Sequence, residues 1–324
     1  MTRARVTAGA RLHFGFCNLS LARERLYGGL GVGLREPRVV LEAAPARNVE
    51  ASDPVVRDAA RRSVSLLSVP GARVSLRGGY PRHVGLGSGT QLALATHAAI
   101  ARAHDHEPNV RAHASGLGRG GRSGVGVGTF ESGGFRLDVG HPTERFTAKR
   151  PADGSWQVPP TGARHDLPEA WRFVVVVPAI EPGKSGAAED GGMSAIVERA
   201  EPAIADEISR VLTQRLLPAA AEGDSERFGS AVSEIGRLNG AWYANEQGGT
   251  YRPPLGGIVD TLGSSSAITG AGQSSWGPTV YGLTTETSVE KARAAANRAL
   301  DRAGVDGETY VCRPASEGAR IEDL

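Results

Sequence analysis

The chain has 324 residues, 40% of them hydrophobic, which is enough for two domains of ordinary size with a substantial core. Its 37 basic and 35 acidic residues leave a net charge of +2, which excludes the strongly basic surface of a nucleic-acid-binding protein. The cysteines Cys17 and Cys312 are too few for a disulfide framework and indicate a reducing cytoplasm. The longest apolar run, at 173–177, is too short to cross a bilayer, so we expect a cytoplasmic protein without membrane contact.

The first half of the chain combines predicted strands, helices and glycine-rich bends. Apolar alternation predicts strands at 4–16, 38–42, 73–76 and 135–139. Helical spacing predicts helices at 53–67, with Asp53 as the N-cap, and at 90–104. The glycines at 28–33 predict a bend, and the interval 151–168, rich in Pro, Gly and Asp, predicts a linker between domains.

The second half begins with a predicted central strand at 173–177, where the residues are apolar and mostly β-branched. Helices are expected at 195–217, 225–247, 258–265 and 288–303. Further strands are expected at 267–270, 279–283 and 309–312. The sequence therefore predicts an α+β protein with two domains, residues 1–165 and residues 166–324.

Three glycine-rich loops, at 85–91, 118–124 and 270–275, are candidates for binding phosphate. A phosphate needs several main-chain N–H donors that converge where no side chain intervenes, ideally at the N-terminus of a helix. The first loop precedes the predicted helix at 90–104, and the second places two guanidinium groups, which match phosphate oxygens, among glycines. Each loop alone is also consistent with an ordinary turn or with solvated arginines. Taken together, the predicted phosphate- or pyrophosphate-binding residues are Gly85, Gly87, Ser88, Gly89, Thr90, Gln91, Arg119, Arg122, Ser123, Gly270, Gly272, Gln273, Ser274 and Ser275.

These loops, in this order, resemble the GHMP kinase superfamily. Residues 81–89, PRHVGLGSG, match its motif P-x-x-x-G-L-G-S-S up to the last serine. The resemblance is closer to the β-ribofuranosylaminobenzene 5′-phosphate synthase family, and it rests on RLHFGF at 11–16, GLGSGTQ at 85–91, RSGVG at 122–126 and GQSSWGPT at 272–279. It covers nearly the whole chain and implies a two-domain GHMP fold, with an N-terminal ribosomal-protein-S5-domain-2-like domain and a C-terminal ferredoxin-like domain.

Enzymes of that family join phosphoribosyl pyrophosphate to 4-aminobenzoate and release CO₂ and pyrophosphate, in the biosynthesis of methanopterin-type one-carbon carriers. The resemblance therefore implies a Mg²⁺-dependent glycosyltransferase, a pentosyltransferase, for which we expect a homodimer. The acceptor stays open between 4-aminobenzoate and 4-hydroxybenzoate. The sequence assigns no metal ligands.

Two positions depart from the pattern of the superfamily's kinases. The aspartate of S-G-x-D, which helps to activate the attacking hydroxyl in such kinases, is replaced by Gly126, and glycine cannot accept a proton. The second serine of G-L-G-S-S is replaced by Gly89. Together these changes favour a phosphate-binding scaffold used for other chemistry. An ATP-dependent small-molecule kinase of the same superfamily stays the main alternative.

Three candidate catalytic residues lie near the N-terminus. Arg25 precedes Gly28 and Gly29, as the family pattern implies, and is expected to bind the pyrophosphate or the benzoate carboxylate. Asn18 stands where that pattern has an acidic residue and brings no negative charge to a metal ion, which leaves open a non-catalytic paralogue that binds a phosphorylated metabolite. His13 is a candidate substrate contact, although a histidine within a strand is more often structural.

Overall fold

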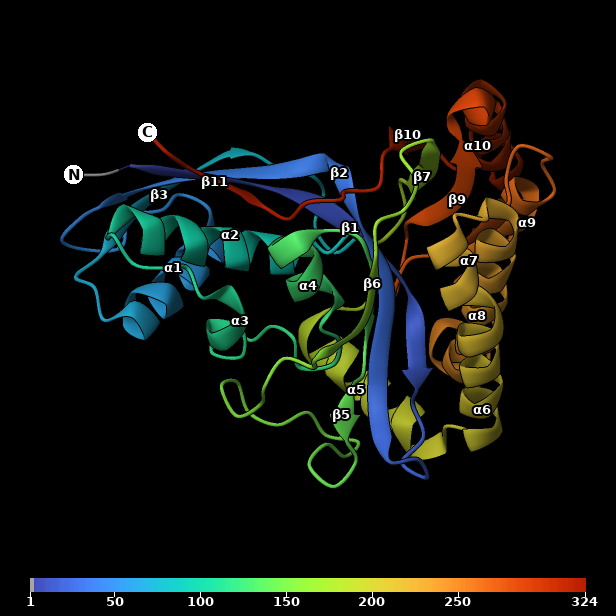
Figure 1. The fold of residues 1–324 in the computed structure, drawn as a ribbon, viewed down its shortest axis with the longest axis horizontal. Coiled ribbons are helices and arrows are strands. Elements are labelled where there is room, and N and C mark those ends of the chain that lie inside the picture. The colour runs from blue at the N-terminus through green and yellow to red at the C-terminus, as the bar shows by residue number, and fades with distance from the viewer. Residues whose placement is uncertain (1–2) are drawn as a thin grey trace.

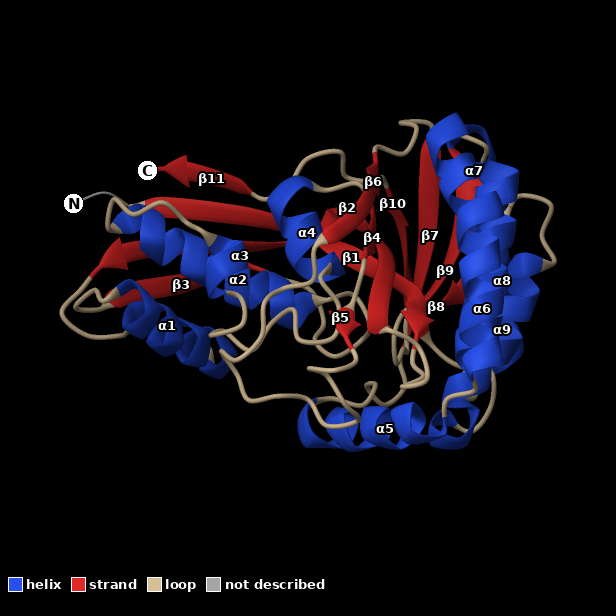
Figure 2. Ribbon diagram, turned by 60° about the horizontal axis from the view of Figure 1, so that its bottom comes forward, coloured by secondary structure: helices blue, strands red, loops and turns tan. Residues whose placement is uncertain are grey.

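The computed structural model describes residues 3–324 and contains two antiparallel sheets that lie side by side, each covered by helices (Figure 1). The first sheet has the order β11-β1-β2-β4-β6, and β3 and β5 pair with β2. The second sheet has the order β10-β7-β9-β8. In Figure 2, α1 and α2 lie on one side of the first sheet, while α8 lies against the second. The α+β architecture expected from the sequence is confirmed by this arrangement.

The strands are β1 (Ala4–Asn18), β2 (Arg25–Pro45), β3 (Ala72–Gly78), β4 (Phe135–Asp138), β5 (His141–Pro142), β6 (Thr161–His165), β7 (Trp171–Pro178), β8 (Gly270–Gln273), β9 (Val280–Thr285), β10 (Gly307–Cys312) and β11 (Arg320–Asp323). The α-helices are α1 (Pro54–Leu67), α2 (Ser88–Ala103), α3 (Val110–His113), α4 (Val125–Ser132), α5 (Gly186–Arg199), α6 (Pro202–Val211), α7 (Leu217–Glu222), α8 (Ser225–Gln247), α9 (Leu255–Gly263) and α10 (Val289–Ala303).

The predicted bend at 28–33 is wrong, because these residues lie inside the 21-residue strand β2. Their glycines allow close packing instead of a turn. A Cβ atom on Gly31 would lie 2.3 Å from the main-chain oxygen of Leu12 in β1, and one on Gly29 would lie 2.0 Å from Oγ of Ser123. Glycine is therefore needed here to let β2 approach its neighbours.

Helix α1 begins as predicted. The Asp53 side chain accepts hydrogen bonds from the main-chain N–H groups of Val55 and Val56 at 3.0 and 3.1 Å, which satisfies two donors at the start of the helix. Helix α2 follows Gly87, whose φ of 76° lies in the left-handed region that favours glycine. The first glycine loop therefore leads directly into a helix, as the sequence indicates.

Two of the predicted segments differ from the structure. The helix expected at 195–217 is broken before Pro202, where Ala200 is extended, and α6 then continues through a π-helical turn at Leu212–Leu216 into α7. The linker expected at 151–168 contains β6, which pairs with β4 in the first sheet. Strand β11 pairs with β1, so the end of the chain returns to the first sheet, while the domain boundary at 165 stays a prediction.

An aromatic cluster joins the two halves of the molecule. The ring of Phe14 in β1 lies 6.2 Å from that of Phe173 in β7, 5.1 Å from that of Tyr281 in β9 and 6.2 Å from that of Phe228 in α8. The side chains on either side of Phe14 in β1 therefore lie at the junction of the two sheets, where the glycine loops also meet. Within residues 3–324, none of the helices combines the length and the apolar character needed to cross a bilayer.

Candidate active site

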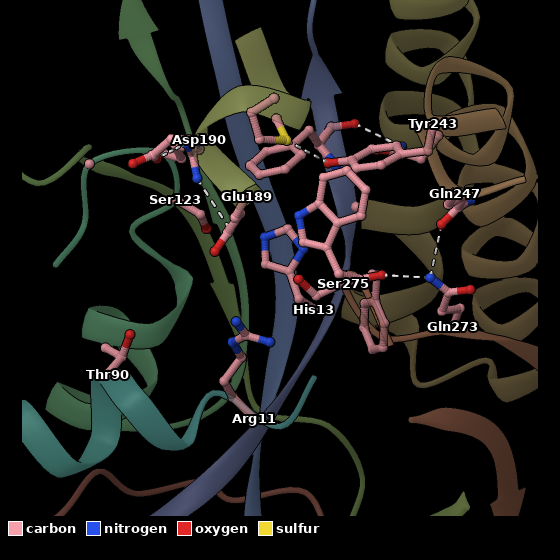
Figure 3. Close-up of a pocket in the computed structure, with 18 of the residues that line it drawn as sticks. Arg11, His13, Thr90, Ser123, Glu189, Asp190, Tyr243, Gln247, Gln273 and Ser275 are labelled. Carbon is pink, nitrogen blue, oxygen red and sulfur yellow. Dashed lines mark hydrogen bonds and ion pairs between the residues drawn. The ribbon is translucent and has the colours of Figure 1, made fainter. Parts of the chain in front are cut away.

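A cavity of about 280 Å³ lies where the three glycine loops meet (Figure 3). Its walls come from β1, the first turn of α2, the segment 118–123, the start of α5, one face of α8 and the segment 273–276. Seven of the residues predicted from the sequence line it: His13, Thr90, Arg119, Arg122, Ser123, Gln273 and Ser275.

The first and third loops are held together by hydrogen bonds. Oγ of Ser274 donates to the main-chain oxygen of Gly85 at 2.7 Å and accepts from the main-chain N–H of His13 at 3.0 Å. Gly85 has a φ of 93°, and a Cβ atom on it would lie 2.4 Å from the main-chain oxygen of Ser274. Glycine is required at position 85 both for this backbone conformation and for this approach.

The remaining predicted phosphate-binding residues do not line the cavity, and the loop predicted at 270–275 is wrong in its first part, because Gly270 and Gly272 lie in strand β8. Nε2 of Gln91 donates to the main-chain oxygen of Gly126 at 3.0 Å and so ties α2 to α4. A Cβ atom on Gly270 would lie 2.0 Å from the main-chain oxygen of Gly229 in α8. The set outside the cavity wall is Gly85, Gly87, Ser88, Gly89, Gln91, Gly270, Gly272 and Ser274.

Arg25 and Asn18 also lie outside the cavity, contrary to the catalytic position expected for them. The guanidinium of Arg25 donates to the main-chain oxygens of Val139 and Gly140 at 2.6 and 2.8 Å. The Asn18 amide donates to the main-chain oxygens of Ser20 and Arg25 at 2.8 and 2.7 Å and accepts from the N–H of Ser20. Their polar groups stabilise the connection between β1 and β2 and the turn after β4, and the structure gives no support for direct substrate contact.

Two arginines flank the N-terminus of α2. Arg11, from β1, donates from Nη1 to the main-chain oxygen of Gly85 at 3.1 Å, and a Cβ atom on Gly87 would lie 2.8 Å from its Cγ. Nη1 of Arg119 lies 3.5 Å from the position of a Cβ atom on Gly89, and its Nε is buried without a hydrogen-bond partner. Within residues 3–324, neither guanidinium forms a salt bridge.

Burial acts on the charge of both groups. It lowers the pKa of Arg11 to about 10 and also lowers the pKa of Arg119. The positive end of a helix adds to this unfavourable concentration of positive charge. An anion at this point would offset both effects, because it would pair with the two guanidinium groups and lie near the positive end of the helix. Arg11 was missing from the predicted site, although its spacing of two residues from His13 on a strand places both on one face.

A third arginine of the cavity, Arg122, forms salt bridges with two acidic residues of α5. Nη1 of Arg122 donates to Glu189 at 3.2 Å, and its Nη2 donates to Asp190. Burial raises the pKa of Glu189 in spite of this pairing. No signal in the sequence marks either carboxylate as part of the site, since an acidic pair near the start of a helix is usually solvated. Because of these carboxylates, the cavity contains charges of both signs, with a net positive balance.

Tyr243 and Trp276 give part of the cavity wall an aromatic surface. The rings of Tyr243 and Trp276 lie 4.7 Å apart in an edge-to-face arrangement, and the hydroxyl of Tyr243 donates to Sδ of Met193. Nζ of Lys184 lies 5.1 Å from the centre of the Trp276 ring. A planar aromatic ligand fits such a wall better than a sugar phosphate does.

His13 lies between the cationic and aromatic parts of the cavity (Figure 3). Burial, with the charge of Arg11 as a second cause, lowers the pKa of His13 well below its ordinary value, so the imidazole is neutral at pH 7. Gln273, in contrast, has no free polar group. Its Nε2 donates to Oε1 of Gln247 and to the main-chain oxygen of Ser275 at 3.1 and 2.9 Å, and its Oε1 accepts from the N–H of Arg252.

The position of the kinase aspartate is closely packed. A Cβ atom on Gly126 would lie 3.1 Å from Cγ2 of Thr90, so a longer side chain would press on the first turn of α2. Among the described residues, no three His, Cys, Asp or Glu side chains group as metal ligands would. The carboxylates that face the cavity are Glu189 and Asp190. Such a pair suits Mg²⁺, which often binds one or two carboxylates together with substrate phosphates.

Comparisons with known proteins agree with this geometry. The family models of the GHMP kinases N terminal domain and the GHMP kinases C terminal domain match residues 54–131 and 216–302. The β-ribofuranosylphenol 5′-phosphate synthase of Methanothermobacter thermautotrophicus is 35% identical over 90% of this chain and 92% of its own length. That of Archaeoglobus fulgidus is 29% identical over 98% and 99%. The phosphomevalonate kinase of Streptococcus pneumoniae shares the fold, with a TM-score of 0.65 over both full chains at 11% identity.

Proposed function

Because the chain belongs to the GHMP kinase superfamily and, within it, to the family of the β-ribofuranosylphenol 5′-phosphate synthases, we propose that it is a phosphoribosyl transferase. Its donor is phosphoribosyl pyrophosphate, and its acceptor is a para-substituted benzoate that loses CO₂. The name of the relatives specifies a phenol product, so 4-hydroxybenzoate is the first choice of acceptor and 4-aminobenzoate the second. The product then serves the biosynthesis of a methanopterin-type carrier.

The observation that carries this proposal is the pair of unpaired arginines, Arg11 and Arg119, at the N-terminus of α2. A pyrophosphate group carries enough negative charge to pair with both and to interact with the positive end of the helix. These groups would stabilise the charge that develops on pyrophosphate as it leaves. The same groups would also bind the phosphates of a nucleotide. The other residues of the cavity must therefore distinguish phosphoribosyl transfer from phosphoryl transfer.

The aromatic wall supplies that distinction. Tyr243 and Trp276 line the cavity and offer aromatic surface for a benzoate ring. His13, which is neutral, lies between the two parts, where donor and acceptor would meet. This division suits a reaction that joins an anionic sugar to an aromatic ring, because it holds the two reactants in one orientation.

The chemistry balances without a strong base. The bond between C1 of ribose and pyrophosphate breaks, and its electron pair leaves with pyrophosphate. The ring carbon that bears the carboxylate donates π electrons to C1, and a carbon–carbon bond forms. The bond to the carboxylate then breaks, its electron pair restores the aromatic ring, and CO₂ leaves. The protein's part is to bind both anions and to keep water from the cationic sugar.

Mg²⁺ stays a proposal. When bound, it would neutralise charge on the pyrophosphate oxygens. Glu189 and Asp190 are the residues that would hold it, since their carboxylates face the same cavity as Arg119. They are engaged with Arg122 in this structure, so the anion would have to replace them there. Assembly as a homodimer likewise stays a prediction.

The kinase alternative is not favoured, because Gly126 provides no carboxylate and its surroundings leave little room for one. The deciding experiment supplies the purified protein with phosphoribosyl pyrophosphate, Mg²⁺ and carboxyl-labelled 4-hydroxybenzoate or 4-aminobenzoate. We expect labelled CO₂ and pyrophosphate in equal amounts, faster with 4-hydroxybenzoate. Absence of both products, together with phosphate transfer from ATP to a small alcohol, would overturn the proposal.

A further inference from the structure

Ser123 lines the cavity, and the proton of its hydroxyl already has a partner. Oγ of Ser123 lies 3.1 Å from Oδ2 of Asp138, at the end of β4. The same Oδ2 accepts from the main-chain N–H of Gly124 at 2.7 Å, and Oδ1 accepts from that of Gly140 at 2.9 Å. Asp138 is 3% exposed, and within residues 3–324 no cation pairs with it. The carboxylate therefore serves to hold hydrogen-bond donors in place.

The direction of these hydrogen bonds follows from the charge of Asp138. An ionised carboxylate only accepts, so Ser123 must donate its one proton to it. Burial raises the pKa of Asp138 to about 6, which still leaves it mostly ionised at neutral pH. The N–H of Val125 donates to Oγ of Ser123 at 3.2 Å and uses one lone pair. What Ser123 can offer a ligand is its second lone pair, and this is an acceptor.

An acceptor at this point is a poor match for a phosphate oxygen, which is itself an acceptor. The hydrogen bonds of Ser123 therefore favour a different role from the phosphate contact expected from the sequence. Ser123 lines the cavity together with Arg119 and Arg122, which are expected to bind the anionic ligand. We therefore expect the group that donates a hydrogen bond to Ser123 to belong to that same ligand. A ribosyl group carries hydroxyl donors a few bonds from its pyrophosphate.

We propose that Ser123, oriented by Asp138, binds a ribose hydroxyl of the donor substrate and so selects ribosyl over deoxyribosyl compounds. This inference rests on the proposed phosphoribosyl transfer. Ser123 contacts the substrate, whereas Asp138 is a positioning residue. A donor that lacks the hydroxyl leaves the lone pair of Ser123 unsatisfied in the cavity, and sites that hydrogen-bond a substrate hydroxyl reject such analogues strongly.

The same network gives Arg25 and Asn18 a place in the site. Nη2 of Arg25 donates to the main-chain oxygen of Gly140, whose N–H is bound by Asp138. Asn18 donates in turn to the main-chain oxygen of Arg25. These two residues therefore support the turn that holds Asp138, and they affect Ser123 through it.

The test compares kcat/KM for phosphoribosyl pyrophosphate and its 2-deoxy and 3-deoxy analogues in the wild type, Ser123→Ala and Asp138→Asn. We expect the wild type to prefer the ribosyl donor over one analogue by at least about tenfold, and both variants to reduce this ratio to about one. Inorganic pyrophosphate, which has no sugar hydroxyl, should bind Ser123→Ala as tightly as the wild type. Asp138→Asn tests whether Asp138 orients the hydroxyl of Ser123. If Asp138→Asn does not fold, Ser123→Ala alone still tests the proposal.

Each contrary result has a distinct meaning. Equal kcat/KM values for all three donors in the wild type would overturn hydroxyl recognition and leave phosphoribosyl transfer standing. A loss of pyrophosphate affinity in Ser123→Ala would show that Ser123 binds phosphate, and weaker Mn²⁺ binding by electron paramagnetic resonance would show a metal ligand; either overturns the inference. If the wild type transfers no ribosyl group, the proposed function fails, and binding of ribose 5-phosphate against its 2-deoxy and 3-deoxy forms still tests Ser123.

Discussion

The side-chain amide of Asn18 donates to the main-chain oxygen of Arg25 at 2.7 Å. Asn18, a candidate catalytic residue in the sequence, therefore stabilises the loop between β1 and β2. A second donation reaches the oxygen of Ser20 at 2.8 Å. An aspartate can accept but cannot make these donations, and its charge would face two carbonyl oxygens. We expect Asn18→Asp to lower the free energy of unfolding by about 1–3 kcal/mol without raising activity. Denaturant unfolding measures this, and a gain of activity in Asn18→Asp would restore the view that position 18 acts in catalysis.

Replacing Arg119 should separate stability from binding. Its buried guanidinium has no ion-pair partner within residues 3–324, so Arg119→Met removes an unfavourable charge from the ligand-free protein. We expect an unchanged or higher Tm without ligand, together with a loss of pyrophosphate affinity of about tenfold or more. Calorimetry measures both quantities, and Arg119→Lys, which keeps the charge, is the matched control. A lower Tm with unchanged affinity would identify Arg119 as a structural residue.

The contact between the first and third loops predicts a large cost at Gly85. An alanine there meets the main-chain oxygen of Ser274 and must adopt a φ of 93°. Gly154 has a φ of 87° but nothing within 4 Å of an added Cβ atom, so Gly154→Ala measures the backbone strain alone. We expect Gly154→Ala to cost about 1 kcal/mol and Gly85→Ala clearly more, with loss of pyrophosphate binding only in the latter. Equal unfolding free energies for the two variants would argue against the loop contact.

Asp138 predicts a specific pH dependence of stability. Burial raises its pKa from 3.8 to about 6, so the folded protein takes up a proton in a range where the unfolded chain does not. Acidification from pH 7 to pH 4 should therefore stabilise the wild type relative to Asp138→Asn, by up to about 3 kcal/mol. Unfolding of both proteins across this range isolates the effect, because other groups titrate alike in the two. A constant difference between them would show that Asp138 keeps an ordinary pKa.

The aromatic wall predicts an effect confined to the acceptor. Trp276→Leu removes most of the flat surface next to Tyr243, so we expect the KM for the benzoate to rise about tenfold. Pyrophosphate affinity, measured by calorimetry, should change less than about twofold, because we propose that the pyrophosphate binds at Arg11 and Arg119 and not at the indole. Tyr243→Phe keeps its ring and serves as the control for the loss of the hydroxyl. An equal loss of affinity for both ligands would place the acceptor elsewhere.

Local signals in the sequence were sufficient to predict some of the elements near the site. Asp53 caps α1 as predicted, and the first glycine loop leads into α2. The three loops could be proposed as one site because they match the superfamily's motifs in order. In contrast, the glycines of β2 indicated a bend, because their close contacts with β1 and Ser123 are made by residues far apart in the chain.

The missing parts of the site depend on tertiary contacts. Arg122 meets Glu189 and Asp190 across more than 60 residues of sequence, and no local pattern marks such a pair. The family pattern drew attention to Arg25 and Asn18, but it could not show that their side chains bind the main chain. Arg11 was within reach of the sequence, since strand alternation places it on the face of His13.

The pairing of β11 with β1 couples the last residues of the chain to the first. During synthesis, the first sheet cannot be completed until β11 has left the ribosome, and until then β1 has an unprotected edge. Such an edge can pair with another chain. A truncation at residue 318 would leave the cavity residues in place and still expose this edge, so its expected phenotype is aggregation during expression.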